Sequence, residues 1–138
     1  MERFLEFANH HPQLVGIAAL LAVAVVAVEA KRALRRWREV GPFEATLMIN
    51  DGALLLDLRD AAAHRAGHIA GSVATSLTEL ERTVGERSKD AAIVAYCETG
   101  TVSAQAAARL SAAGYRQVVA LRGGLAGWRA ESLPLAAG

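Results

Sequence analysis

The residues best suited to chemistry stand in one short loop that begins at the only cysteine, Cys97. This cysteine directly follows an apolar run, residues 91–96, and precedes a stretch with helical spacing. A loop between a strand end and a helix N-terminus receives backbone N–H groups and a partial positive charge. Both favour the thiolate, which is the nucleophilic form of cysteine. We therefore expect Cys97 to be a nucleophile; the alternative is a structural cysteine that serves as a small buried apolar side chain.

The residues after Cys97 form the expected substrate-binding loop. They are Glu98, Thr99, Gly100, Thr101, Val102 and Ser103. Gly100 permits a tight turn through positive φ. The loop carries no cation, and the carboxylate of Glu98 is expected to raise the pKa of the neighbouring thiol.

Three apolar runs of strand length supply the elements that position this loop: residues 53–58, 91–96 and 117–121. Between the last two, residues 101–113 have apolar side chains at helical spacing, and a short final helix is expected over 125–131. A strand, helix, strand order predicts a parallel pair with a right-handed crossover. The fold class is therefore α/β, with a central parallel sheet flanked by helices.

Composition excludes several classes of protein. The chain has 138 residues, enough for one ordinary domain, and is 53% hydrophobic but only 5% aromatic, so the core must be aliphatic. A single cysteine rules out an internal disulfide and a cysteine-rich zinc site, and we expect neither a metal nor a cofactor. Residues 39–138 hold nine Lys or Arg against eleven acids, which argues against nucleic-acid binding.

Several motifs, in order, resemble those of the rhodanese family over about residues 42–135. They are Asp57-x-Arg59, Gly67-His68-Ile69-x-Gly71-Ser72, Cys97-x-x-Gly100-x-x-Ser103, Gly114-Tyr115, Gly123-Gly124-Leu125 with Trp128, and Leu133-Pro134-Leu135. The layout of the whole chain also resembles small bacterial rhodaneses with one N-terminal transmembrane helix.

The resemblance implies a sulfurtransferase without a cofactor. The Cys97 thiolate would take a sulfane sulfur from a donor and pass it, as a persulfide, to a thiol or cyanide-like acceptor. Val102 stands where the family often has arginine, so we expect weak activity with thiosulfate and a protein-bound or low-molecular-weight persulfide as donor. The alternative is a weakly active or inactive adaptor that binds partners at the membrane.

Four polar residues outside the loop are expected to support it. Asp57 and Arg59 are expected to pair at a strand end and brace neighbouring loops, rather than to be catalytic. His68 is expected to be a hydrogen-bonded loop histidine, with a general base as the alternative. Arg122 is a candidate source of the positive charge that the cysteine loop lacks.

The N-terminal residues 1–38 are expected to be a membrane anchor, with a span at about 12–30, and residues 39–138 the rhodanese-like domain. Residues 14–28 carry no charge, and five Lys or Arg follow between positions 31 and 38. The positive-inside rule then places the N-terminus outside the bacterial inner membrane and the domain in the cytoplasm, with Trp37 at the headgroup level and Gly41-Pro42 ending the helix that leaves the membrane. A cleaved signal peptide and a buried helix of a soluble bundle are the alternatives. Lipid and other inner-membrane proteins are the partners expected at this end.

Overall fold

A computed structural model describes residues 1–34 and 37–137 of the chain. The chain divides into two compact units, residues 1–35 and 36–138, which are described separately. Arg35 and Arg36, two of the basic residues that follow the apolar run, lie outside the described residues.

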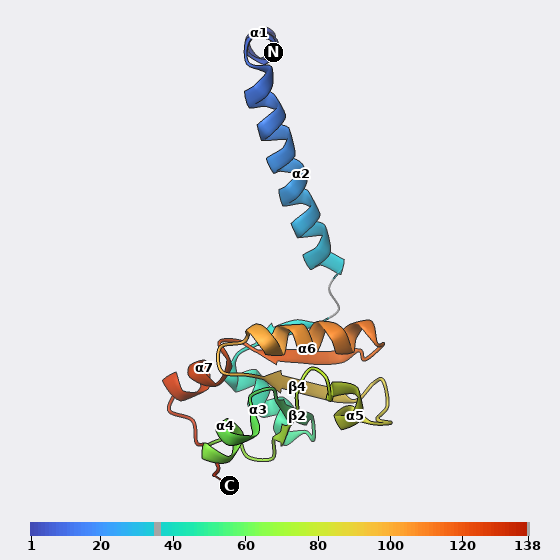
Figure 1. Ribbon diagram of the computed structural model, residues 1–138, viewed down its shortest axis with the longest axis vertical. Coiled ribbons are helices and arrows are strands. Elements are labelled where there is room, and N and C mark those ends of the chain that lie inside the picture. The colour runs from blue at the N-terminus through green and yellow to red at the C-terminus, as the bar shows by residue number, and fades with distance from the viewer. Residues whose placement is uncertain (35–36, 138) are drawn as a thin grey trace. The chain divides into compact units, whose positions relative to one another are not determined.

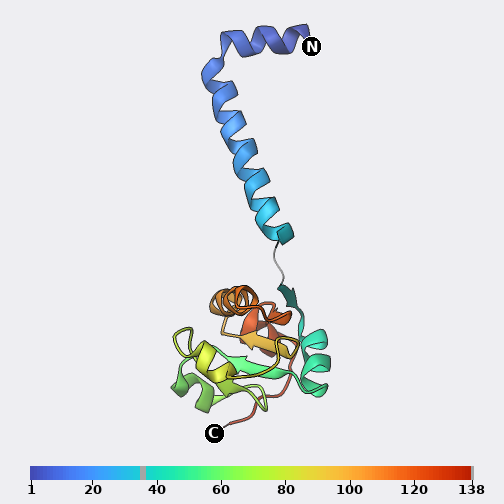
Figure 2. The same ribbon diagram turned by 90° about the vertical axis from the view of Figure 1, so that its right-hand side faces the viewer.

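The first unit contains two helices, α1 (Glu2–His10) and α2 (Pro12–Leu34). Within α2, residues 12–31 have a mean hydropathy of 2.2, and no part of this stretch is buried. Among the described residues it is the one helix long and apolar enough to cross a membrane, and an N-terminal signal sequence has the same properties. Figure 2 shows the chain bending sharply between α1 and α2.

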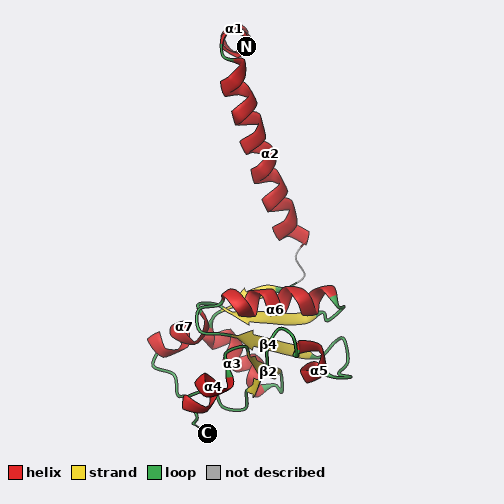
Figure 3. Cartoon of the chain, in the orientation of Figure 1, coloured by secondary structure: helices red, strands yellow, loops and turns green. Residues whose placement is uncertain are grey.

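The second unit is built on a five-stranded parallel sheet with the order β1-β5-β4-β2-β3. Figure 3 shows its strands in yellow, with helices packed around them. The strands are β1 (Arg38–Val40), β2 (Leu54–Asp57), β3 (Val73–Ala74), β4 (Ala92–Tyr96) and β5 (Gln117–Leu121). The register aligns Asp57 with Tyr96 and Ala95 with Ala120, so three central strands end near one line. The predicted parallel strand pair and central sheet are confirmed.

Helices cover both faces of this sheet (Figure 1). They are α3 (Pro42–Asn50), α4 (Ala61–Ala66), α5 (Leu80–Val84), α6 (Thr101–Ala112) and α7 (Gly124–Ala130). Buried side chains of α5 and α6 join one core cluster, and those of α3 and α7 join the other.

The alternation of side chains along the strands produces these two clusters. Ile93 and Ala95 of β4 point toward α6, whereas Val94 and Tyr96 belong to the cluster on the α7 side, and all four are fully buried. Each large aliphatic side chain so buried contributes about 1.5–3 kcal/mol to folding. Burial on both faces explains why the strand reads as a continuous apolar run.

The prediction that Trp37 lies at the headgroup level is wrong. Trp37 is only 9% exposed and belongs to the core cluster that also contains Leu110 of α6. Residues 38–40 form β1 along β5 rather than a continuation of the membrane helix to Gly41-Pro42. Because β1 pairs with β5, the tryptophan that precedes it lies in the core, where the large apolar surface of its indole ring is removed from water.

Candidate active site at the carboxyl end of β4

The cysteine loop connects the central strand β4 to the longest helix of the domain. Cys97 directly follows β4, and α6 begins four residues later at Thr101. Gly100 caps this helix with φ at +104°, a left-handed conformation that a side chain would strain. The turn places the amides at the start of α6 close to the sulfur of Cys97. The residue Cys97 is only 4% exposed.

Two backbone amides and one hydroxyl surround the Cys97 sulfur. The amide of Gly100 donates to Sγ at 3.0 Å, and the amide of Ser103 does so at 3.5 Å. The Ser103 hydroxyl lies 3.5 Å from Sγ and donates to the carbonyl of Gly100 at 3.1 Å. The same hydroxyl can turn its hydrogen toward a thiolate, so this loop is built to stabilise negative charge on sulfur.

The thiol is therefore more acidic than a free cysteine. Burial raises the pKa of Cys97, but the hydrogen bonds from the Ser103 side chain and from the amides of Ser103, Gly100 and Thr99 lower it by more. A lowered pKa enlarges the thiolate fraction at neutral pH.

Glu98 does not act on the thiol as the sequence suggested. Its carboxylate accepts a hydrogen bond from Arg129 at 2.5 Å, and its second oxygen lies 3.7 Å from Arg59. The two guanidinium groups neutralise the charge that was expected to raise the pKa of Cys97. The prediction was wrong because these partners come from other parts of the chain, α7 and the loop after β2.

The loop is held in place by the N-terminus of α7. The amides of Leu125 and Ala126 donate to the carbonyls of Cys97 and Glu98, at 2.8 and 3.0 Å. This approach requires glycine at position 124, where a Cβ atom would stand 2.4 Å from the carbonyl oxygen of Cys97. Gly124 thus lets the start of α7 come close enough for the amides of Leu125 and Ala126 to hold the backbone of the cysteine loop.

A buried carboxylate organises the neighbouring strand end. Asp57 is fully buried, and its two carboxylate oxygens accept hydrogen bonds from Nε and Nη2 of Arg59, at 3.1 and 2.9 Å. Tyr96, the residue before the cysteine, donates its hydroxyl to the same carboxylate at 3.0 Å. Burial raises the pKa of Asp57, but the hydrogen bonds from Arg59 and His64 lower it overall, so the group is an anion.

Two histidines continue this network. Because Asp57 is ionised, His64 must donate its Nδ1 hydrogen to the carboxylate, across 2.9 Å. His68 donates Nδ1 to the carbonyl of His64 at 2.7 Å, and the two rings stack 4.0 Å apart. His68 thus makes a hydrogen bond to the backbone within its own loop region. His64 was missed by sequence reasoning because it lies in an alanine-rich segment without a motif.

Arg122 lies on the other side of the loop from Asp57. With Glu39, Thr99 and Thr101 it lines an open pocket of about 440 Å³. Its guanidinium reaches the carbonyl of Glu39 at 3.5 Å. Among the described residues no carboxylate pairs with it, in contrast to Arg59 and Arg129, so its charge is available beside the loop.

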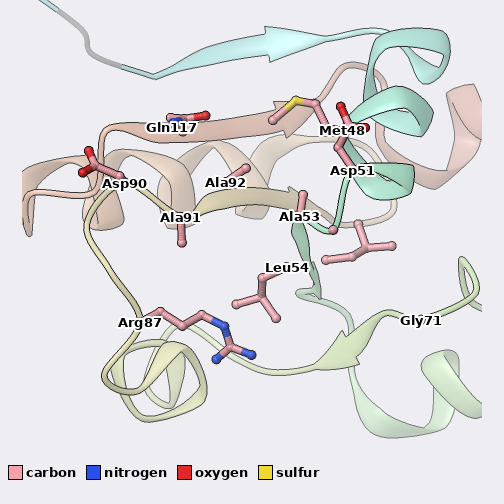
Figure 4. Close-up of a pocket in the computed structure, with 12 residues that line it drawn as sticks. Met48, Asp51, Ala53, Leu54, Gly71, Arg87, Asp90, Ala91, Ala92 and Gln117 are labelled. Atoms are coloured by element: carbon pink, nitrogen blue, oxygen red, sulfur yellow. The ribbon is translucent and has the colours of Figure 1, made fainter.

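A larger pocket of about 560 Å³ lies at the amino ends of the strands, opposite to the cysteine loop. Figure 4 shows it lined by Leu54, Ala92 and Gln117, which stand at the amino ends of β2, β4 and β5, with Arg87 and Asp90 nearby. Ligands of parallel α/β sheets bind at the carboxyl ends. The larger pocket therefore lies at the wrong end of the strands for a ligand site. The reactive cysteine at the carboxyl end of β4 identifies the candidate active site instead.

Comparison with known families agrees with this arrangement. The model of the rhodanese-like domain family matches residues 42–131, which include the cysteine loop and the Asp57 network. The chain belongs to the rhodanese-like family. A crystal structure of the Alr3790 protein from Anabaena superposes with a TM-score of 0.65 at 26% identity, covering 72% of this chain and 82% of the other.

Two curated relatives of this rhodanese-like protein differ in how much of the chain they match. The uncharacterized protein YibN of Escherichia coli K12 is 34% identical over 142 residues, covering 100% of this chain and 99% of its own. Thiosulfate sulfurtransferase GlpE of Ectopseudomonas mendocina is 31% identical over 97 residues, covering 70% of this chain and 89% of its own. The similarity to YibN extends through the N-terminal helices, whereas the similarity to GlpE covers about as much of the chain as the second unit.

Proposed function

We propose that this protein is a membrane-tethered sulfurtransferase that carries a sulfane sulfur on Cys97. The main support is the setting of Sγ, which receives two backbone amides and lies beside the Ser103 hydroxyl at the end of β4. These groups lower the pKa of the thiol, and they are equally placed to hold the negative charge of a persulfide.

The reaction proceeds in two balanced steps. The Cys97 thiolate attacks the outer sulfur of a donor, the donor's sulfur bond breaks, and the remainder leaves as a thiolate or as sulfite. The Cys97 persulfide then gives its outer sulfur to an acceptor nucleophile, and the thiolate is restored. Neither step needs an oxidant, a reductant or a metal ion.

The charge of the loop favours persulfides of thiols over thiosulfate as the donor. Val102 supplies no cation, and both arginines nearest to Glu98 are occupied by carboxylates. The thiosulfate dianion therefore meets backbone dipoles and a single cationic side chain, Arg122, which lines the pocket beside Thr99 and Thr101. We therefore expect weak activity with thiosulfate.

The membrane part of the proposal rests on α2. Its apolar stretch is followed by the basic residues of positions 31–38, which favour a cytoplasmic location for the second unit. The protein would then be a single-pass protein of the bacterial inner membrane, within reach of other proteins of that membrane.

Intact mass spectrometry of the full-length protein tests the sulfur-transfer step. The detergent-solubilised chain and its Cys97→Ser variant are incubated with glutathione persulfide or with thiosulfate, and cyanide is then added. We expect one added sulfur on the native chain only, more readily from the persulfide, and its release as thiocyanate.

A second candidate function is that of an adaptor, favoured by the absence of a cation on the loop and by the paired state of Glu98. The mass measurement separates the two functions. A native chain that takes up no sulfur from either donor would leave the adaptor as the better explanation.

A further inference from the structure

The helix α1 has one apolar face that nothing in its own unit covers. Phe4, Leu5 and Phe7 are 65%, 58% and 51% exposed, and no residue of α1 is buried. At 100° per residue, these side chains and Ala8 share one side of the helix. The opposite side carries Glu2, Arg3, Glu6, Asn9 and His10.

The sequence also requires the helix to break between α1 and α2. Pro12 opens α2, and a residue before proline is disfavoured in the helical conformation. His11 accordingly has φ −132° and ψ 61°, so α1 cannot continue along the axis of α2. The bend seen in Figure 2 is thus encoded, and one residue separates α1 from the start of the apolar stretch.

A nine-residue helix is too short to be stable in water by itself. It therefore requires a surface that covers its apolar side. If α2 spans a bilayer, as proposed above, the surface next to residue 11 is the boundary between headgroups and acyl chains. Amphipathic helices lie in that boundary with the apolar side turned toward the acyl chains.

We infer that α1 is an interfacial helix that binds the lipid surface at the N-terminal end of the span. The charges on its polar side favour electrically neutral headgroups over anionic ones. Its two glutamates outnumber its one arginine, so the helix gains nothing from a negatively charged membrane. Insertion depends on the four apolar side chains, and the anchor then holds the membrane by two elements with different orientations.

Site-directed spin labelling of the full chain in phosphatidylcholine nanodiscs tests this inference. The Cys97→Ser background removes the native thiol, and single cysteines are introduced by Phe4→Cys, Ala8→Cys, Glu6→Cys and Asn9→Cys. Ala8 and Asn9 form a matched pair, because they are adjacent in sequence but Ala8 belongs to the apolar face and Asn9, about 100° away, to the polar face. We expect the ratio of oxygen to nickel-chelate accessibility to be several-fold higher at positions 4 and 8 than at 6 and 9.

A label at Ala19→Cys in α2 separates this inference from the proposed span. Oxygen accessibility at position 19 with equal nickel accessibility at all four α1 positions would overturn the interfacial helix and leave the span intact. Nickel accessibility at position 19 as well would overturn both. Spin–spin broadening at positions 4 and 8 that disappears on dilution with unlabelled protein would overturn the lipid assignment in favour of a second copy of the chain.

Discussion

At the scale of single residues, the acidity of the sulfur depends on few atoms. Ser103 acts on Cys97 through both its amide and its hydroxyl, and the hydroxyl is the strongest of the groups that lower the thiol pKa. We predict that Ser103→Ala raises the pKa of Cys97, because the thiolate loses a donor while burial remains. The rate of alkylation by iodoacetamide, recorded against pH, should then rise at a higher pH than in the native protein. Ser111→Ala, farther along the same helix, serves as the control, and coincident profiles for all three proteins would contradict the prediction.

The charge of a second residue, Glu98, affects which sulfur donor the protein prefers. Replacing it by Glu98→Gln keeps the shape of the side chain but leaves Arg129 without its carboxylate and removes a charge beside Arg59. We predict that sulfur transfer from thiosulfate becomes about two- to fivefold faster, the magnitude expected for an exposed charge pair, and that the gain declines in high salt.

Glu86→Gln is the matched control for this variant, since it removes one exposed negative charge away from the loop. The persulfide of 2-mercaptoethanol carries a single negative charge, so it should gain less from Glu98→Gln than the thiosulfate dianion does. An equal increase in the rate of transfer from thiosulfate with Glu86→Gln would contradict the prediction, because the net charge of the protein would then explain the effect.

At the scale of elements, the site depends on how α7 approaches the cysteine loop. Gly124 has φ at +58°, and a Cβ atom there would overlap the backbone of Cys97 and Glu98. We predict that Gly124→Ala costs about 2–6 kcal/mol of unfolding free energy, combining backbone strain with overpacking, and weakens the hydrogen bonds to both carbonyls. Urea denaturation measures the first effect, and the alkylation profile of Cys97 measures the second.

Gly71→Ala provides the comparison for that variant. Gly71 also has a positive φ, at +84°, but a Cβ atom added there would meet no other atom within 4 Å. Its replacement should cost only the strain, about 1–3 kcal/mol, and should leave the thiol unchanged. Equal losses of stability in the two variants would mean that close approach to the loop is not what position 124 requires.

The elements themselves were predictable where their burial is complete. The strands β2, β4 and β5 and the helix α6 were predicted to within about one or two residues, because runs such as residues 91–96 are buried on both sides. Strands β1 and β3 have only three and two residues and lie at the sheet edges, so no apolar pattern marks them. The missed strand β1 also caused the error on Trp37.

Only some features of the candidate site could be predicted from the sequence. Cys97, with its strand before and helix after, can be recognised from local sequence, as can the glycine that turns the loop. The partners of Glu98 and the contact of His64 with Asp57 join segments that are distant along the chain, and such pairings have no local signature. Sequence alone therefore identified the candidate nucleophile but misjudged the charge around it.

At the scale of the whole molecule, the charges near α2 determine on which side of a membrane Cys97 works. Residues 1–38 hold six Lys or Arg against three acids, and five of the six follow the apolar stretch. We predict that protease added to spheroplasts leaves residues 37–138 intact, whereas protease added to inverted inner-membrane vesicles degrades them. Lys31, Arg32, Arg35 and Arg36 replaced together by glutamine should reduce this preference, since they supply most of the asymmetry. A chain released from the membrane without its first thirty residues would instead identify α2 as a cleaved signal sequence, and Cys97 would then act outside the cytoplasm.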